Sequence, residues 1–117
     1  MNPVPFFADF VSILVFVIIG RMSHDHGISV DGVSSTLWPF AIGLLVGWAA
    51  MMRRRRSGMS LADAEWIVIS TVAVGMVLRV IAGQGTAFAF VVVAGVFLSA
   101  FMLGWRLAVG FLHRARR

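Results

Sequence analysis

Residues 51–58 read MMRRRRSG and place four consecutive arginines, Arg53, Arg54, Arg55 and Arg56, near the midpoint of a 117-residue chain. The sequence on either side of this block is strongly apolar. Arginine and lysine residues next to membrane-spanning segments stay on the cytoplasmic side of the membrane. The block therefore predicts two hydrophobic halves that are joined at the cytoplasmic face.

The composition is that of an integral membrane protein. Hydrophobic residues make up 60% of the chain and charged residues 13%, with a mean hydropathy of +0.94, which leaves too little polar surface for a water-soluble domain. The chain has no cysteine, which excludes disulfides and thiolate metal sites. The formal charge of +5 comes from arginines at the ends of apolar runs. This distribution indicates anionic lipid headgroups, and not nucleic acid, as partners.

Polar and basic stretches divide the chain into four apolar segments of the length that a spanning helix needs. We expect a single all-α transmembrane domain over residues 1–117, built as a bundle of four helices. The expected helices cover residues 4–22, 36–52, 65–82 and 86–112, with an outer loop over 23–35 and a basic cytoplasmic loop over 53–62. Pro39 falls in the first turn of the second helix, where a missing N–H is tolerated.

The charges and tryptophans near the helix ends agree with this topology. Basic residues close the chain at Arg114, Arg116 and Arg117, and an even number of spans then places both termini in the cytoplasm. The tryptophans suggest an interfacial aromatic belt. Those toward the cytoplasm are Trp48, Trp66 and Trp105, and the one toward the outside is Trp38.

Three of the expected helices carry small residues spaced four apart. These pairs are Gly43 and Gly47, Thr71 and Gly75, and Gly95 and Ser99. Such stripes let helix backbones approach closely in lipid, where no hydrophobic force drives helices together. We interpret them as packing positions within one bundle, and a dimer seam is the alternative.

Four charged residues fall inside or close to the expected hydrocarbon: Asp9, Arg21, Arg79 and Arg106. An ionisable group at mid-helix costs at least about 2.5 kcal/mol and usually faces a partner or a wet cavity. With a rise of about 1.5 Å per residue, Asp9 and Arg106 fall at the inner level of the membrane. Arg21 and Arg79 fall at the outer level.

Each of these charges has a structural and a functional interpretation. We interpret Arg106 as a side chain that snorkels to the inner headgroups. Arg21 is a helix-end anchor or a paired charge. Arg79 either snorkels or serves as an internal pairing or anion-binding group. Asp9 either marks a helix start, where the dipole favours a carboxylate, or is a carboxylate linked to protons or cations.

The segment His24-Asp25-His26 resembles a metal clip. Two histidines one residue apart, without a third distant ligand, supply at most a partial site. We interpret the segment as a solvated loop and predict neither a metal nor a cofactor. The sequence also lacks phosphate-binding, dinucleotide-binding, zinc-protease and nucleophile-elbow patterns, so we do not expect an enzyme.

Several short motifs together carry a family resemblance. They are Asp9, Phe16, GRMSH (20–24), TLWPF (36–40), Gly43, Gly47, Trp48, GMVLR (75–79), GQGT (83–86), Phe90 and GWR (104–106). With these motifs the chain resembles the domain-of-unknown-function family 3054 over nearly its whole length. The resemblance implies four transmembrane helices in a prokaryotic inner membrane, and it brings no reaction, substrate or partner. It coincides with Asp9, Arg21, His24, Arg79 and Arg106.

Two functional hypotheses remain open. The first is a small oligomeric transporter or channel, in which Asp9 couples to protons or cations and Arg21 and Arg79 hold an anionic group. Four helices alone make a poor pathway, so this hypothesis predicts a homo-oligomer. The second is an accessory or assembly subunit of a larger membrane complex, bound to a membrane-protein partner and without transport activity of its own.

Overall fold

The computed structural model describes residues 2–23 and 27–116, and over these residues it contains four α-helices and no strand. The helices are α1 (Val4–Ser23), α2 (Val30–Arg53), α3 (Leu61–Ile81) and α4 (Phe88–Ala115). All four are long and apolar enough to cross a membrane, with mean hydropathies of 2.0, 1.5, 1.8 and 2.2. The predicted all-α membrane fold of four helices is therefore confirmed.

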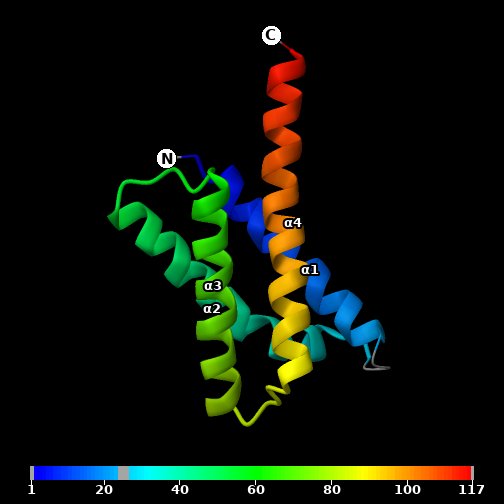
Figure 1. Cartoon of the computed structure of the whole chain (residues 1–117). Helices are drawn as coiled ribbons and strands as arrows, with labels where there is room; N and C mark the ends of the chain where they lie inside the picture. Colours follow the sequence, from blue (N-terminus) through cyan, green and yellow to red (C-terminus); the bar gives the residue numbers. More distant parts are fainter. Residues whose placement is uncertain (1, 24–26, 117) are drawn as a thin grey trace.

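The helices form a ring in which each one contacts its two neighbours. α2 packs most extensively on α3, and α1 packs on α2 and α4. The start of α1, the α2–α3 connection and the end of α4 lie toward one end of the bundle (Figure 1). We call this the arginine end, because it holds residues 53–56. The opposite end holds the end of α1, the start of α2 and residues 82–87, and we call it the turn end.

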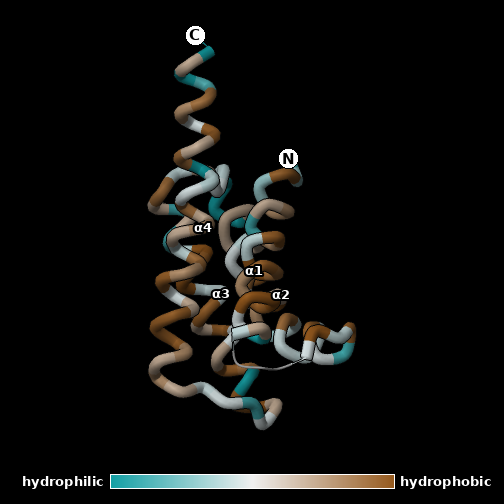
Figure 2. The backbone as a smooth tube through the Cα atoms, turned by 90° about the vertical axis from the view of Figure 1, so that its right-hand side faces the viewer, coloured by the Kyte–Doolittle hydropathy of each residue, from teal (hydrophilic) through white to brown (hydrophobic). Residues whose placement is uncertain are grey.

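Both the interior and the outer surface of the bundle are apolar. Inside, the ring of Phe16 packs against those of Phe40, Phe90 and Phe97, with centroid distances of 5.8, 6.0 and 5.3 Å. Outside, large side chains such as Val96 are mostly exposed, and hydrophobic residues dominate all four helices (Figure 2). An all-round apolar helix is typical of a membrane span.

α2 begins six residues earlier than the sequence predicted, at Val30. The side chain of Ser29 accepts a hydrogen bond from the N–H of Gly32 at 3.0 Å, and Asp31 lies in the first turn. A serine cap and a first-turn carboxylate both stabilise a helix start. The polar composition that suggested a loop over residues 23–35 therefore includes the start of a helix, and the prediction of that loop is partly wrong.

The other helix boundaries differ by smaller amounts. α3 begins at Leu61 and not near residue 65, because the side chain of Ser60 caps the helix by accepting from the N–H of Asp63 at 3.0 Å. α4 begins at Phe88 and continues to Ala115, three residues beyond the predicted end. The α2–α3 connection is accordingly shorter than the predicted 53–62 loop.

Pro39 lies inside α2, and not in its first turn as predicted. Proline has no N–H, so the carbonyl of Ser35 four residues earlier loses its helical partner. The side-chain amide of Gln84 donates to this carbonyl at 3.0 Å. A residue of the α3–α4 connection thus supplies the missing hydrogen bond and ties that connection to α2.

Small residues of α2 and α3 lie where these two helices meet. A Cβ atom at Gly43 would lie 2.6 Å from the carbonyl oxygen of Thr71, and one at Gly75 would lie 2.8 Å from the ring of Phe40. These glycines therefore permit the close α2–α3 contact. On α4, a Cβ atom at Gly95 would meet no atom within 4 Å, so Gly95 takes no part in such a contact.

α4 is the helix with the most free surface. It extends past the other helices at the arginine end (Figures 1 and 2). In the apolar segment of α4 that is long enough to span a membrane, 17% of the residues are buried, compared with 33%, 39% and 33% in α1, α2 and α3. One long face of α4 is therefore open to lipid or to another protein.

Candidate functional site

A buried ion pair joins α1 to α4 near the arginine end. The Nη1 atom of Arg106 donates to Oδ1 of Asp9, and its Nη2 atom donates to Oδ2, each at 2.8 Å. The side chains of Arg106 and Asp9 are 1% and 0% exposed. A bidentate arginine–carboxylate contact is strong and directional, so it fixes the position of α1 relative to α4.

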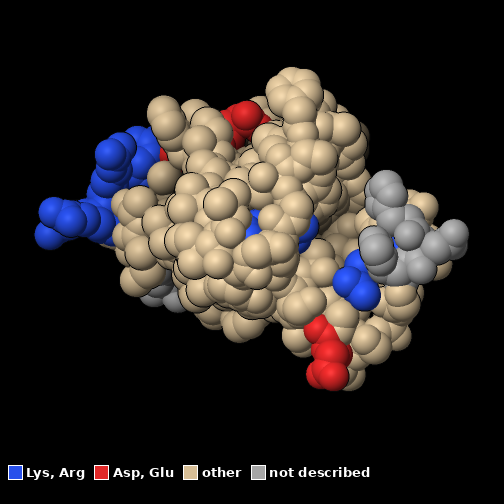
Figure 3. Space-filling model, turned by 90° about the horizontal axis from the view of Figure 1, so that it is seen from below, with Lys and Arg blue, Asp and Glu red and all other residues tan. Residues whose placement is uncertain are grey.

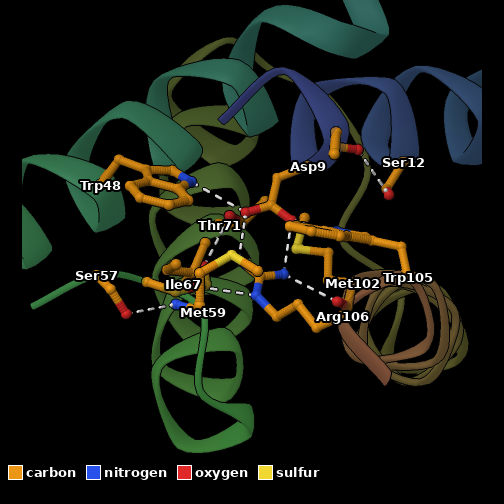
Figure 4. Close-up of polar contacts among 12 residues, drawn as sticks. Asp9, Ser12, Trp48, Ser57, Met59, Ile67, Thr71, Met102, Trp105 and Arg106 are labelled. Atoms are coloured by element: carbon orange, nitrogen blue, oxygen red, sulfur yellow. Dashed lines mark hydrogen bonds and ion pairs between the residues drawn. The ribbon is translucent and has the colours of Figure 1, made fainter. Parts of the chain in front are cut away.

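Two tryptophans complete the surroundings of the Asp9 carboxylate (Figure 4). The indole N–H of Trp48 in α2 donates to Oδ2 at 3.0 Å, and that of Trp105 in α4 donates to Oδ1 at 2.9 Å. Each carboxylate oxygen therefore accepts one indole and one guanidinium hydrogen bond. This uses the acceptor capacity of the carboxylate, which is about four hydrogen bonds.

Arg106 has further partners besides Asp9. Its Nε atom donates to the carbonyl of Gly58 and its Nη1 atom also donates to that of Met102, both at 2.8 Å. The guanidinium carbon lies 4.4 Å from the ring centroid of Trp105. Within residues 2–23 and 27–116, no buried side-chain nitrogen or oxygen lacks a partner. We call Asp9, Trp48, Trp105 and Arg106 the Asp9 network, in which the Asp9 carboxylate has no acceptor position left for a further ligand.

The α2–α3 connection contacts the Asp9 network through the carbonyl of Gly58, which accepts a hydrogen bond from Arg106. Gly58 has a φ of +75°, and a Cβ atom there would lie 2.4 Å from the Trp48 ring, so only glycine fits without strain. The carboxylate of Asp63 accepts from the N–H of Gly58 at 3.3 Å and pairs with Arg56. These contacts hold the carbonyl of Gly58 in place for Arg106.

A cavity of about 620 Å³ lies at the turn end and is lined by residues from all four helices. Its polar lining includes Arg21, Thr36, Arg79 and Gln84, and its apolar lining includes Phe16, Val17, Phe90 and Val93. A view onto this end shows basic atoms recessed among uncharged side chains (Figure 3). The cavity thus combines cationic groups with apolar walls.

Arg21 is held at the end of α1 by neutral acceptors. Its Nε atom donates to the carbonyl of Gly27 at 2.8 Å, and its Nη1 atom donates to Oγ1 of Thr36 at 3.0 Å. The guanidinium group also packs against Gly32, where a Cβ atom would lie 2.3 Å from Nη2. The side chain therefore has a defined position beside the cavity.

Arg79 is held at the end of α3 in a closely similar way. Its Nε atom donates to the carbonyl of Gly85 and its Nη1 atom to Oε1 of Gln84, both at 2.8 Å. The guanidinium carbon lies 4.6 Å from the ring centroid of Phe90. In both arginines, Nε donates to the carbonyl of a glycine six residues later in the chain.

These two arginines differ from Arg106 in their electrostatic partners. Over the part of the chain that the structure describes, the ion pairs are Arg106 with Asp9 and Arg56 with Asp63. Within the same residues, no carboxylate neutralises Arg21 or Arg79. The turn-end cavity is therefore cationic, and its chemistry suits the binding of an anion.

The structure brings together the charges that the sequence placed at two levels. Asp9 and Arg106 are in direct contact, and Arg21 and Arg79 line one cavity. The interpretation of Arg106 as a snorkelling residue is wrong, because its side chain is buried against Asp9. Asp9 lies in the second turn of α1 and not at its start, so the helix-start interpretation is also wrong.

The aromatic-belt interpretation fails for two of the four tryptophans. Trp48 is 4% exposed, and it and Trp105 donate to Asp9 in place of a headgroup. Trp38 and Trp66 are 39% and 62% exposed and remain available to a membrane interface.

His24, Asp25 and His26, like Arg117, lie outside the described residues. Among the residues that are described, no group of three or more His, Cys, Asp or Glu side chains could hold a metal ion.

Sequence reasoning missed the roles of Trp48, Trp105 and Gln84. One signal was present, since a Gly-Trp pair occurs near the same end of two helices, at residues 47–48 and 104–105. A buried indole N–H needs an acceptor, and Asp9 is the carboxylate in the apolar run of α1. The role of Gln84 depends on the position of Pro39 inside α2, which in turn depends on where that helix starts.

A family model described as "Protein of unknown function (DUF3054)" matches residues 6–109. The chain belongs to this family. The DUF3054 match includes every member of the Asp9 network and both arginines of the turn-end cavity, and it confirms the family predicted from the sequence motifs. No curated protein and no solved structure matches the chain.

Proposed function

We propose that the protein binds an organic anion in the turn-end cavity, with Arg21 and Arg79 as the groups that hold the anion. One observation carries the proposal: two guanidinium groups line one cavity, and no carboxylate among the described residues neutralises them. A cation in a membrane protein is costly unless it has a partner or reaches water. An anionic ligand between the two arginines would offset this cost.

The apolar part of the cavity narrows the class of ligand. The lining includes Phe16, Val17, Phe90 and Val93, and a volume of about 620 Å³ is typical of a small-molecule site. Arginine pairs well with both carboxylate and phosphate groups. We therefore infer a ligand with a carboxylate or phosphate attached to a hydrocarbon portion.

The Asp9 network supports a binding role in preference to proton-coupled transport by a single bundle. Asp9 is fully buried, all its acceptor positions are used, and it does not line the turn-end cavity. The packed rings around Phe16 lie against the same cavity. We assign Asp9 a structural role, and transport would require a homo-oligomer or a rearrangement of the helices.

Orientation and location are part of this proposal. The arginine end carries residues 53–56 together with Arg114 and Arg116, and basic residues favour the cytoplasmic side. We therefore propose that the turn-end cavity faces outward in a prokaryotic plasma membrane. Anionic headgroups would contact the arginine end, and we propose binding without catalysis.

Equilibrium binding to the purified protein in nanodiscs of neutral lipid tests the proposal. The probes are dodecanoate and dodecyl phosphate, with dodecanol as the uncharged control and empty nanodiscs to correct for partitioning. We expect Arg79→Gln and Arg21→Gln each to weaken binding of the anions by about tenfold, because each removes a charge-assisted contact.

Arg114→Gln is the matched control. It makes the same change of charge on an exposed residue at the arginine end, and we expect it to leave binding unchanged. Equal affinity for dodecanol and dodecanoate would contradict the proposal, as would unchanged affinity in both cavity variants.

The free face of α4 favours a second candidate, an accessory subunit of a larger membrane complex. This helix is the least buried of the four, and an exposed apolar face is available to a partner helix. Gentle extraction from native membranes followed by intact-complex mass spectrometry distinguishes the two. A complex of defined stoichiometry with a different protein would favour the subunit role, and a free monomer or homo-oligomer would count against it.

A further inference from the structure

A second cavity lies at the arginine end, on the far side of the molecule from the proposed anion site. It has a volume of about 620 Å³, and its basic lining consists of Arg55, Arg56 and His113. Apolar residues that line it include Val4, Met52 and Val109. The cavity therefore has cationic groups beside a hydrocarbon surface, at the level where the chain turns between α2 and α3.

The backbone at Arg55 is unusual. Arg55 has a φ of +53°, which places it in the left-handed region that disfavours residues with a side chain. The N–H of Arg56 donates to the carbonyl of Met51 and that of Arg55 to Met52. This is the Schellman arrangement, in which the left-handed position after a helix normally holds glycine.

The end of α3 provides a comparison within the same chain. The N–H of Gln84 donates to the carbonyl of Arg79 and that of Gly83 to Val80, so α3 ends in the same arrangement. Here the left-handed position holds Gly83, with a φ of +76°. An arginine where glycine is favoured points to a role for its side chain, since the local backbone does not benefit from it.

The basic residues of this cavity are not equally free to meet an anion. Arg56 already pairs with the buried carboxylate of Asp63. Arg55 and His113 pair with no carboxylate among the residues that the structure describes. The uncompensated charge at the cavity is therefore centred on Arg55, with the imidazole of His113 as a further hydrogen-bonding group.

We propose that this cavity binds the phosphate headgroup of an anionic phospholipid, with Arg55 as the main phosphate-binding residue. Arginine binds phosphate oxygens through several N–H groups. The hydrocarbon portion of the lipid lies along Val4, Met52 and Val109. These apolar residues favour a lipid over a free phosphate compound, because such a compound has no hydrocarbon portion to pack against them.

The bound lipid would also affect the Asp9 network. Trp105 lines the cavity and donates to Asp9, so an occupant restricts the same side chain that completes the network. A ligand that binds only the folded state raises its stability. The site rests on the proposed contact of anionic headgroups with the arginine end, and it is independent of the proposed anion site, because none of its residues lines the turn-end cavity.

Native mass spectrometry of the purified protein in neutral detergent tests the site. Phosphatidylglycerol is titrated against phosphatidylcholine of the same acyl chains. We expect one molecule of phosphatidylglycerol to bind at least about fivefold more tightly than phosphatidylcholine, which corresponds to one charge-assisted contact. A rise in the melting temperature should accompany binding.

Two variants isolate Arg55. Arg55→Gln should lose the preference for phosphatidylglycerol, whereas Arg54→Gln should keep it, because Arg54 carries the same charge but does not line the cavity. Arg55→Gly removes the charge and also suits the left-handed backbone. It should therefore lose the preference while the protein melts at the same or a higher temperature.

Three results would overturn the proposal. The first is an equal loss of preference in the Arg54 and Arg55 variants, which would indicate general attraction to a basic surface. The second is equal binding of the two lipids to the native protein. The third is full displacement of phosphatidylglycerol by inorganic phosphate at comparable concentration, which would assign the cavity to a soluble phosphate compound.

Discussion

At the arginine end, Arg106 is buried against the Asp9 carboxylate, to which two indoles also donate. At the turn end, Arg21 and Arg79 line a cavity, and among the described residues their hydrogen-bond acceptors are neutral oxygen atoms. The first arrangement provides a counter-ion within the chain and leaves the carboxylate no acceptor position for a further ligand. The second contains no carboxylate partner among the described residues, so that an anionic ligand could act as the counter-ion. Charges in a membrane bundle can thus have opposite roles depending on whether the fold supplies their partner.

The largest expected difference between the ends is in stability. Asp9→Asn leaves the buried guanidinium of Arg106 without a counter-charge, and we expect a loss of about 3–5 kcal/mol in the free energy of unfolding. Arg79→Gln removes a partly exposed charge that has no ion-pair partner among the described residues, and we expect a change of about 1 kcal/mol or less. Unfolding in mixed micelles by SDS titration measures both. Equal losses in the two variants would show that the ends do not differ in this way.

Two glycines sharpen the same comparison, because Gly58 and Gly83 have nearly equal φ values of +75° and +76°. Gly83→Ala should cost about 1–2 kcal/mol for the left-handed backbone, since a Cβ atom there meets nothing within 4 Å. Gly58→Ala should cost about 1–3 kcal/mol more from its overlap with Trp48. The same SDS titration tests this order, and a Gly83 variant that is as unstable as the Gly58 variant would contradict it.

The tryptophans of the Asp9 network should stabilise the fold through the hydrogen bonds that their indole N–H groups donate to Asp9. Trp48→Phe and Trp105→Phe each remove one hydrogen bond to a charged acceptor, and we expect each to cost about 1.5–3 kcal/mol. Trp66→Phe changes an exposed ring and should alter stability by about 0.5 kcal/mol or less. Tryptophan fluorescence during thermal unfolding follows all three variants. A loss of stability in Trp66→Phe as large as in the other two variants would contradict the claim that the indole hydrogen bonds to Asp9 stabilise the protein.

The smallest expected loss of stability is that of a substitution at the turn end, Gln84→Leu. Gln84→Leu removes the hydrogen bonds that the side chain makes to Ser35 and Arg79, and we expect a loss of about 0.5–1.5 kcal/mol. Hydrogen exchange should become faster in residues 82–87 and at the start of α2, and remain unchanged near Asp9. Faster exchange at the arginine end would mean that the two ends are coupled.

The sequence predicted the four helices, the family and the division of the four charges between the two ends of the bundle. Those features depend on composition and on distance along a helix, which a single segment already contains. The pairing of Asp9 with Arg106 could not be predicted in the same way, because it depends on α1 packing against α4. The sequence interpretation of Arg106 as a snorkelling residue considered one helix in isolation.

The starts of α2 and α3 were also predicted incorrectly from the sequence. Ser29 and Ser60 are good capping residues, but their surroundings resembled loops in composition, so the predicted helices began too late. The position of Pro39 was then wrong, and with it the free carbonyl of Ser35 that Gln84 satisfies. Local polar composition therefore identified the ends of the spans less well than the capping pattern would have done.

A double-mutant cycle between Asp9→Asn and Arg106→Gln tests the central claim most directly, which is that this buried pair holds the arginine end together. The free energy of unfolding is measured for the native protein, the two single variants and the double variant. We predict a coupling energy of at least about 2 kcal/mol, with the double variant more stable than the sum of the single losses implies. Losses that add to within about 0.5 kcal/mol would contradict the account, because they would show that Asp9 and Arg106 act independently.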